Sequence, residues 1–460
     1  MKALADPTNA LALGLAAIRA QYKVPQAFPP EVLDAAADTA RRAPTGLGDR
    51  TAMRFVTLDP ATSTDLDQAF AIDRDGGELL LHYAIADIAW FVDDGGVIDA
   101  EAWRRGSTLY LPDGKAGLYP PILSEAAASL LPDGPRPAVI FTVRVAADGA
   151  VRLDGVERAI IRSRAKLAYD GVRDDDLPDG FVELAERIDA AETRRGAARV
   201  DPPEQEVAAL GDGRYALEFR PRLLSEERNA ALSLAANLAI ADVLLAHQTG
   251  LFRVMAPPDD KAIERLRLTA RGFALDWPAA ASLADFERGL DPHDPRQAAF
   301  MLAIRRASPG ASYAPYQPGM VPWHAAMAAT YAHATAPLRR LADRYVIRAT
   351  LAIANGQPVP AVVSEAFARL PQVMAHADGL SGQVDRAVID LAEAVMLEGQ
   401  EGHVFAAIVT TVDQRGLRLQ LRDLPVVATV PGQGVPGETL NIRLTAAKPE
   451  QRLISFEQLG

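Results

Sequence analysis

The chain has 460 residues, 49% of them hydrophobic and 23% charged, which is the composition of a folded protein with two or three domains. It contains no cysteine, so disulfides, zinc–thiolate sites and iron–sulfur clusters are excluded. The net charge of −12 argues against a general polyanion binder, and any nucleic acid would need a locally basic surface. The N-terminal stretch has neither the layout of a signal peptide nor the ~20 apolar residues of a membrane span. We therefore expect a cytoplasmic protein with no membrane partner.

The first 50 residues predict a short helical segment, and the next hundred predict strands. Helices are expected at 9–22 and 30–43, separated by the turn-forming VPQAFPP; a helix-turn-helix-like arrangement is one form they can take. The runs FVTLD, QAFAID and LLLHYAIADIAWFV are short, apolar and rich in β-forming residues. The stretch PAVIFTVRVAADGAVRLDGVERAII predicts a hairpin that turns at ADG.

From residue 224 the pattern becomes helical. Ser225 can cap an Ala- and Leu-rich helix that ends at Gly250, with two glutamates in its first turn. His333 is expected to be a structural residue of a later helix. Those later helices are predicted at 259–271, 325–334, 337–354 and 362–398, the last with a break or restart at Pro371.

The last 60 residues change to an alternating pattern. The runs VFAAIVTTV, GLRLQLRD, VVATV and TLNIRL are short strands at close spacing, and Leu417, Leu419 and Leu421 face one way between polar neighbours. This pattern predicts a small all-β barrel of the OB type.

The stretch TLDPATSTDLDQAF contains three aspartates, Asp59, Asp65 and Asp67, within nine residues. Asp65 and Asp67 can point the same way if this piece is extended. Oxygen ligands that converge on a loop suit a hard cation such as Mg²⁺. Spacing alone favours this metal site no more than an ordinary turn in which the aspartates bond to their own backbone.

Five motifs occur in the order in which the ribonuclease II family carries them. TLDPATSTDLDQAF resembles the Asp-rich signature of the family's RNB-type catalytic domain. AIADIAWFV, LYLPDG, SRAKLAYD and TYAHATAPLRRLADRYV are similar to its later motifs, and the resemblance covers residues 55–399. It implies an α+β fold with a helical segment at 1–50, a mixed α/β RNB-type catalytic domain at 51–399 and an RNA-binding OB-fold at 400–460.

The resemblance also implies an activity and the residues that perform it. The activity is processive, Mg²⁺-dependent hydrolysis of RNA from its 3′ end to nucleoside 5′-monophosphates by a monomer, with Mn²⁺ as a substitute ion. The partner is the 3′ end of single-stranded RNA, with structured RNA as a further candidate. The implied catalytic residues are Asp59, Asp65, Asp67 and Arg339, the implied metal ligands are Asp59, Asp65, Asp67 and Gln68, and the implied RNA-binding residues are Tyr110, Tyr169, Glu226 and Asp385.

The segment TAPLRR predicts a helix that begins at its proline. Arg339 and Arg340 would then lie at the positive end of the helix dipole, which binds phosphate, and arginine adds bidentate recognition. A purely structural ion pair between Arg339 and Asp343 remains the alternative. Arg344 and Arg348 continue the helical face of Arg340, so we expect this stripe to contact the RNA backbone.

Three features depart from the family pattern. Gln68 replaces the family's fourth aspartate, so we expect weaker metal binding or a carboxylate from elsewhere. Ala230 and Ala231 replace a Glu-Glu pair, for which Glu226, Glu227 or Asn229 could substitute. About 50 upstream residues are too few for tandem cold-shock barrels, so we expect duplex RNA to be tolerated nearer the active site. Two alternatives stay open: a catalytically weakened RNA-binding protein and a phosphodiesterase acting on small nucleotides.

Overall fold

The computed structural model describes residues 4, 6, 8–197, 204–211, 213–220, 222–291, 294–413 and 416–459. Its centre is a seven-stranded sheet with the strand order β1-β8-β7-β4-β3-β2-β9. Neighbouring strands are antiparallel except for the two edge pairs, β1 with β8 and β2 with β9, which are parallel. The strands are β1 Gly48–Asp49, β2 Phe55–Asp59, β3 Gln68–Asp75, β4 Glu78–Ala86, β7 Arg136–Val145, β8 Val151–Ile161 and β9 Ser163–Ala168.

One face of the sheet is covered by helix α5 (Leu224–Ala246), which lies along β4, β7 and β8. By length and composition α5 could cross a membrane, but 67% of its most apolar window is buried inside the protein, as expected for the central helix of a core. Its first turn differs from the prediction, because Leu223 and not Ser225 occupies the N-cap position. The Ser225 hydroxyl instead donates a hydrogen bond to the carbonyl of Tyr169.

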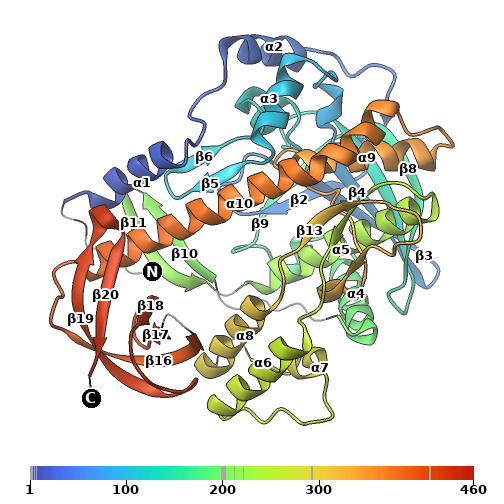
Figure 1. Cartoon of the computed structure of the whole chain (residues 1–460). Helices are drawn as coiled ribbons and strands as arrows, with labels where there is room; N and C mark the ends of the chain where they lie inside the picture. The colour runs from blue at the N-terminus through green and yellow to red at the C-terminus, as the bar shows by residue number, and fades with distance from the viewer. Residues whose placement is uncertain are drawn as a thin grey trace.

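Helix α10 (Ala361–Leu397) crosses the whole molecule and connects the sheet region to the C-terminal barrel (Figure 1). The predicted break at Pro371 is wrong, because the helix continues through it. The side chains of Phe367, Leu370 and Met374 are buried on both sides of the proline. Burial of this continuous apolar face outweighs the loss of one backbone hydrogen bond.

The helix predicted at 325–334 is also wrong. This segment forms a small hairpin of β14 (Trp323–His324) and β15 (Ala329–Thr330), followed by irregular chain. Its backbone groups bond to neighbouring elements: the Tyr331 carbonyl accepts from the Arg253 amide, and the Ala334 amide donates to Asn237. A helix would have to give up these tertiary bonds.

The remaining elements surround this frame. Around α10 lie α3 (Val97–Arg105), α9 (Leu341–Ala354), the hairpin β5–β6 (Leu109–Leu111, Gly114–Ala116) and the hairpin β10–β11 (Glu204–Gly211, Arg214–Arg220). Helix α4 (Phe181–Arg195) packs on α5, and β12 (Leu251–Val254) pairs with β13 (Ser312–Pro315). Helices α6 (Asp260–Gly272), α7 (Leu283–Glu287) and α8 (Pro295–Ala307) form a small module around Trp277, Phe286 and Phe300.

The N-terminal helices pack on different parts of the protein (Figure 1). Helix α1 (Ala10–Gln21) lies on α10, where Leu15 and Leu391 belong to one apolar cluster. Helix α2 (Pro30–Ala40) joins the main core near α3 through Val32 and Ala36. These two helices therefore do not form a helix-turn-helix pair.

The C-terminal residues form the predicted barrel. Five antiparallel strands follow the order β18-β17-β16-β19-β20, and the edge strands β18 and β20 are in contact, so the barrel is nearly closed. Leu417, Leu419 and Leu421 are all buried inside it, which confirms their shared face. The strands are β16 Val404–Asp413, β17 Gly416–Leu421, β18 Val427–Val430, β19 Thr439–Lys448 and β20 Leu453–Gln458. The α+β fold class is confirmed.

Candidate active site

Asp67 joins two segments that are far apart in the sequence. It ends the loop between β2 and β3, and its carboxylate is buried. Its Oδ1 accepts a hydrogen bond of 2.7 Å from the amide of Leu338, and its Oδ2 lies 3.3 Å from Nε of Arg339. The acidic loop and the arginine turn are therefore held together by one aspartate.

The turn that carries Arg339 precedes a helix instead of beginning it. Helix α9 starts at Leu341, so the predicted start at Pro337 is wrong. Asp343 in the first turn of α9 accepts from the Ala336 amide at 2.8 Å and forms an ion pair with Arg340 at 2.7 Å. Asp343 therefore fixes the turn, and Arg339 is left to pair with Asp67.

Asp59, the last residue of β2, lines a cavity together with Arg339. Burial raises the pKa of Asp59 to about 6 and that of Asp67 to about 7, and the positive charge of Arg339 offsets only part of this rise. Asp65 contributes to both shifts as a like charge. The charges of the three predicted aspartates thus influence one another.

Asp65 is held by the hairpin β5–β6. The Tyr110 hydroxyl donates to its Oδ2 at 3.0 Å, and the Lys115 ammonium lies 2.9 Å from its Oδ1. Tyr110 remains 48% exposed. Both carboxylate oxygens of Asp65 are therefore engaged by protein groups.

Gln68 begins β3 and lines the cavity. Its Oε1 accepts hydrogen bonds from the hydroxyls of Tyr83 and Ser233, the latter at 2.9 Å. Tyr83 is fully buried in β4, and Ser233 lies on α5. The Gln68 amide oxygen, which was predicted to bind metal, thus accepts hydrogen bonds from two hydroxyl groups instead.

The four-residue metal set predicted from the sequence fits only in part. Among the described residues, no three His, Cys, Asp or Glu side chains lie close enough together to hold an ion. Asp65, Asp67 and Gln68 have their oxygens engaged by other protein groups. Asp59 fits a hard cation, because a divalent charge would offset the burial that raises its pKa.

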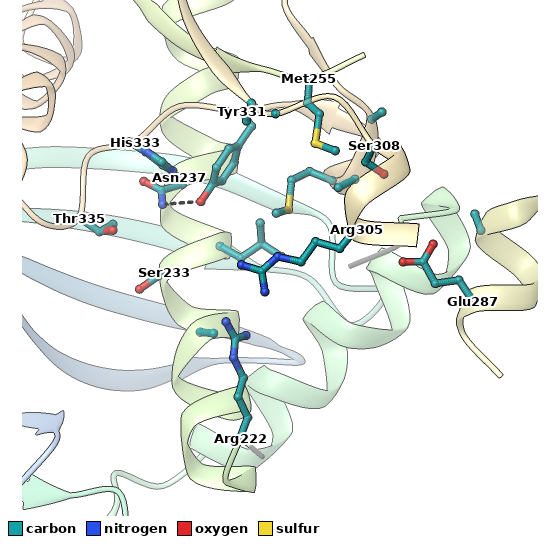
Figure 2. A pocket seen from close by; sticks show the side chains of 18 of the residues that line it. Arg222, Ser233, Asn237, Met255, Glu287, Arg305, Ser308, Tyr331, His333 and Thr335 are labelled. Atoms are coloured by element: carbon teal, nitrogen blue, oxygen red, sulfur yellow. Dashed lines mark hydrogen bonds between the residues drawn. The ribbon is translucent and has the colours of Figure 1, made fainter. Parts of the chain in front are cut away.

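The cavity has a volume of about 880 Å³, and its lining includes Asp59, Arg339 and several residues of α5 but neither Asp65 nor Asp67. In Figure 2, Arg222 and Arg305 extend toward each other from opposite walls, and Glu287 lies beyond Arg305. Apolar residues such as Met255 and Met327 also line the cavity. The lining thus combines charged and apolar surface.

A network of polar bonds supports the floor of the cavity (Figure 2). Asn237 on α5 donates to the Tyr331 hydroxyl at 3.2 Å and accepts from the Ala334 amide at 3.0 Å. His333 shares a 2.9 Å hydrogen bond with the Tyr313 hydroxyl. Burial and neighbouring arginines lower the pKa of His333 well below its usual value, so it is neutral. These bonds fix the segment that leads into the Arg339 turn.

Two further predicted RNA-binding residues, Tyr169 and Glu226, line the cavity. Asn229 donates to the Tyr169 hydroxyl at 2.9 Å and to the carbonyl of Leu58 at 3.1 Å, which fixes the ring beside Asp59. Glu226 accepts from the Leu223 amide and pairs with Arg220 at 3.0 Å. Their roles toward RNA stay predictions.

The predicted arginine stripe of Arg340, Arg344 and Arg348 does not form one shared surface. Arg344 is 1% exposed and pairs with Asp99, so its predicted role in RNA binding is wrong. Arg348 pairs with Asp94. Arg340 lines the cavity with Asp343 as its counter-ion. Arg344 and Arg348 thus pair with acids of the segment 94–99, a tertiary arrangement that the sequence pattern could not reveal.

Asp385 is exposed on α10, where it accepts a bond from Ser381, and it is not among the residues that line the cavity.

The sequence reasoning missed Lys115, Tyr83 and Ser233. Lys115 could have been found, because the two-residue turn of LYLPDGKA makes it the cross-strand partner of Tyr110. Tyr83 and Ser233 carry no such signal, since a tyrosine in a strand and a serine in a helix are ordinary.

Comparisons with known proteins agree with this architecture. The RNB domain model matches residues 48–355, and the model of the RNase II-type exonuclease C-terminal S1 domain matches residues 403–459. The chain is 28% identical over 397 residues to ribonuclease R of Aquifex aeolicus, covering 80% of this chain and 55% of that protein. It is 30% identical over 407 residues to exoribonuclease 2 of Cronobacter sakazakii, covering 83% and 62%. The chain thus spans somewhat more than half the length of these relatives.

Solved structures share the fold. Mycoplasma genitalium RNase R in complex with ribose-methylated single-stranded RNA superposes with a TM-score of 0.86 at 19% identity, covering 98% of this chain and 78% of that one. The same protein in complex with double-stranded RNA gives 0.83 at 20% identity, covering 98% and 83%. The domain boundaries predicted at residues 50 and 399 stay predictions.

Proposed function

The chain belongs to the RNB family, and from that premise we propose that it is a metal-dependent exoribonuclease that hydrolyses RNA processively from the 3′ end to nucleoside 5′-monophosphates. One observation carries the proposal: Asp67 holds Arg339, which lines the same cavity as Asp59. A protein that only binds RNA has no need of buried carboxylates beside a phosphate-binding arginine.

The residues have separable tasks in this reaction. The Arg339 side chain is 45% exposed while Asp67 is buried, so the guanidinium is anchored on one edge and presents the other to a phosphate. Tyr110 and Tyr169 offer rings to the terminal bases, with stacking worth about 1–3 kcal/mol each. Asp59 would hold Mg²⁺ or Mn²⁺, which would polarise a phosphoryl oxygen and activate water, while Asp67 anchors Arg339. Water adds to the phosphorus, the bond to the 3′-oxygen breaks, and that oxygen takes a proton.

The test uses two labels on the same single-stranded RNA. The 3′-labelled strand should release a labelled mononucleotide at once, and the 5′-labelled strand should end as a short remnant without intermediates. Chelator and Asp67→Asn should both stop the reaction. The matched control is Asp73→Asn, which alters an exposed aspartate of β3 that bonds to His82 outside the cavity. Circular RNA of the same sequence should remain intact.

Internal cuts in circular RNA, or full activity of Asp67→Asn, would overturn the proposal. Binding without shortening would instead favour the alternative, a weakened RNA-binding protein. Cleavage only of small phosphodiesters would favour the nucleotide phosphodiesterase.

We extend the proposal to structured RNA. The double-stranded RNA complex of the Mycoplasma protein, which shares this fold, motivates this part. Hairpins with 3′ overhangs of graded length provide the test. Digestion should continue into the stem, and an abrupt stall several nucleotides before it would contradict this part alone.

A further inference from the structure

Three arginines from three elements meet at the junction of helix α8, helix α10 and the C-terminal barrel. They are Arg306 in the last turn of α8, Arg386 on α10 and Arg418 on strand β17 (Figure 1). The Nη1 atom of Arg306 lies 3.5 Å from the Thr411 hydroxyl, and Thr411 is the direct cross-strand partner of Arg418. Because cross-strand partners lie on the same face of a sheet, Arg306 reaches the barrel beside Arg418.

Arg386 joins this junction from α10. Arg386, Asp390 and Glu393 are spaced by four and three residues, so they share one face of the helix. This face lies on the barrel, because Glu393 accepts a hydrogen bond of 2.8 Å from the Val427 amide. Val427 belongs to β18, which pairs with the strand of Arg418. We call Arg306, Arg386 and Arg418 the junction cluster.

The charges of the junction cluster are close enough to affect one another. Arg306 reaches the surface, yet the surrounding protein and the like charges of Arg418 and Arg386 lower its pKa to about 10. Among the described side chains, no carboxylate offsets this effect on Arg306. Burial raises the pKa values of the two acids on this face of α10, Asp390 and Glu393, so their negative charge is weakened. The junction cluster is therefore locally positive in a protein with a net charge of −12.

Helix α8 connects the junction cluster to the cavity. Arg305, the residue before Arg306, lines the cavity and extends into it (Figure 2). Consecutive side chains of a helix point about 100° apart, so the last turn of α8 directs one arginine to the cavity and the next to the barrel. An RNA strand whose 3′ end lies at Arg339 can therefore pass from Arg305 to Arg306 as it leaves the cavity.

We propose that the junction cluster is a second RNA-binding site, which binds phosphates of the strand that protrudes from the cavity. The inference rests on the proposed function for the direction of that strand. Arginine suits this task because its guanidinium binds phosphate oxygens with two parallel hydrogen bonds. A phosphate between neighbouring guanidiniums also relieves their mutual repulsion. The site contacts only strands that are longer than the cavity can hold.

Ordinary packing of α8 on the barrel is the competing explanation for the arginines. Ile408 of β16 already packs against the apolar cluster that Trp277 and Phe300 form with the helices α6 to α8. The contact between α8 and the barrel thus has an apolar basis of its own. A packing role predicts a loss of stability, whereas a phosphate-binding role predicts a loss of RNA affinity that depends on strand length.

The experiment measures the binding of 5′-fluorescein-labelled single-stranded RNA by anisotropy, in chelator so that the strand stays intact. One strand has about 4 nucleotides and the other about 16. The double variant Arg306→Gln/Arg386→Gln should bind the longer strand about tenfold more weakly and the shorter strand as the wild type does. For the longer strand, the slope of log K against the logarithm of the salt concentration should become shallower by about 1.4, because each lost contact contributes about 0.7.

The matched control is the double variant Arg369→Gln/Arg443→Gln. It removes the same charge from α10 and the barrel outside the junction cluster, where Arg369 stacks on Trp103 and Arg443 pairs with Glu457. This control should bind both strands as the wild type does. If Arg306→Gln/Arg386→Gln does not fold, Arg386→Gln alone, at an exposed position, should make the slope shallower by about 0.7.

Unchanged binding of the longer strand, equal losses for both strands, or the same loss in the control would overturn the inference. A lower melting temperature with unchanged RNA binding would show the packing role instead. The release of a 3′ label from the shorter strand with Mg²⁺ is measured in parallel. If the length-dependent loss occurs but the wild type releases no mononucleotide, the proposed function fails and the second RNA-binding site stands. If RNA is digested and the variant binds both strands as the wild type does, only the second site fails.

Discussion

Glu393 connects the long helix α10 to two other elements. It is 3% exposed, and its Oε1 accepts from the Val427 amide of the barrel at 2.8 Å and from the Gln205 side chain of β10 at 2.7 Å. Burial raises the pKa of Glu393 to about 7, and the two hydrogen bonds offset this rise only in part. We predict that Glu393→Gln stabilises the protein at alkaline pH, because the amide keeps the acceptor and removes the buried charge.

The magnitude follows from the pKa difference between the folded and unfolded states. In the folded protein the acid keeps its proton up to about pH 7, whereas the unfolded chain releases it near its usual value of 4.5. Stability therefore falls as the pH rises through this window and is flat above it. At 1.36 kcal/mol per pKa unit, the glutamine variant should be more stable by roughly 3 kcal/mol near pH 8.5 and by only roughly 1 kcal/mol near pH 5.

The assay is urea unfolding followed by circular dichroism at both pH values. The control is Glu365→Gln, an exposed position on the same helix, which should change stability by less than about 0.5 kcal/mol. A Glu393→Gln variant that is less stable than the wild type near pH 8.5, or a gain that does not shrink toward pH 5, would refute the reasoning.

Three further predictions concern the site and its surroundings. Arg339→Lys should lower kcat/KM on single-stranded RNA about a hundredfold, because one ammonium cannot bind Asp67 and a phosphate in the bidentate geometry of arginine; a loss under threefold would contradict this. Arg344→Met should destabilise the fold by about 3–5 kcal/mol in thermal or urea unfolding, since Asp99 loses its buried counter-ion, and the RNA affinity of the protein that stays folded should not change. Tyr110→Ala should weaken RNA binding by about 1–3 kcal/mol in a fluorescence titration while Tyr110→Phe keeps most of the affinity; equal losses would show that the hydroxyl and not the ring contacts RNA.

The sequence predicted most of the elements that have a strong local pattern. The alternation of Leu417, Leu419 and Leu421 identified the barrel, and the ADG turn identified the hairpin β7–β8. Both predictions succeeded because one-sided burial and turn formation depend on a few neighbouring residues in the sequence. The helix at 325–334 and the break at Pro371 were wrong, because distant partners decided both segments. The Arg253 amide of β12 and the Asn237 side chain of α5 hold the first segment, and a buried face on both sides of the proline maintains the second.

The candidate site divides in the same way. The motifs identified Asp59, Asp65, Asp67 and Arg339 as a group, but not which aspartate holds the arginine. Asp67 is in place to hold the arginine because it accepts a hydrogen bond from the Leu338 amide. That amide lies in a turn that Asp343 fixes, and Asp343 comes 276 residues after Asp67 in the sequence.

The sequence by itself determined the kinds of residues, their order along the chain and the family they resemble. Only the tertiary structure decided the charge balance around the acids, namely that Lys115 neutralises Asp65 and that two hydroxyls engage Gln68. The physical reason is that side-chain identity and local backbone pattern are properties of a few consecutive residues. Ion pairing and burial depend on which distant elements meet, and that is settled only when the sheet, α5 and the hairpin β5–β6 pack together.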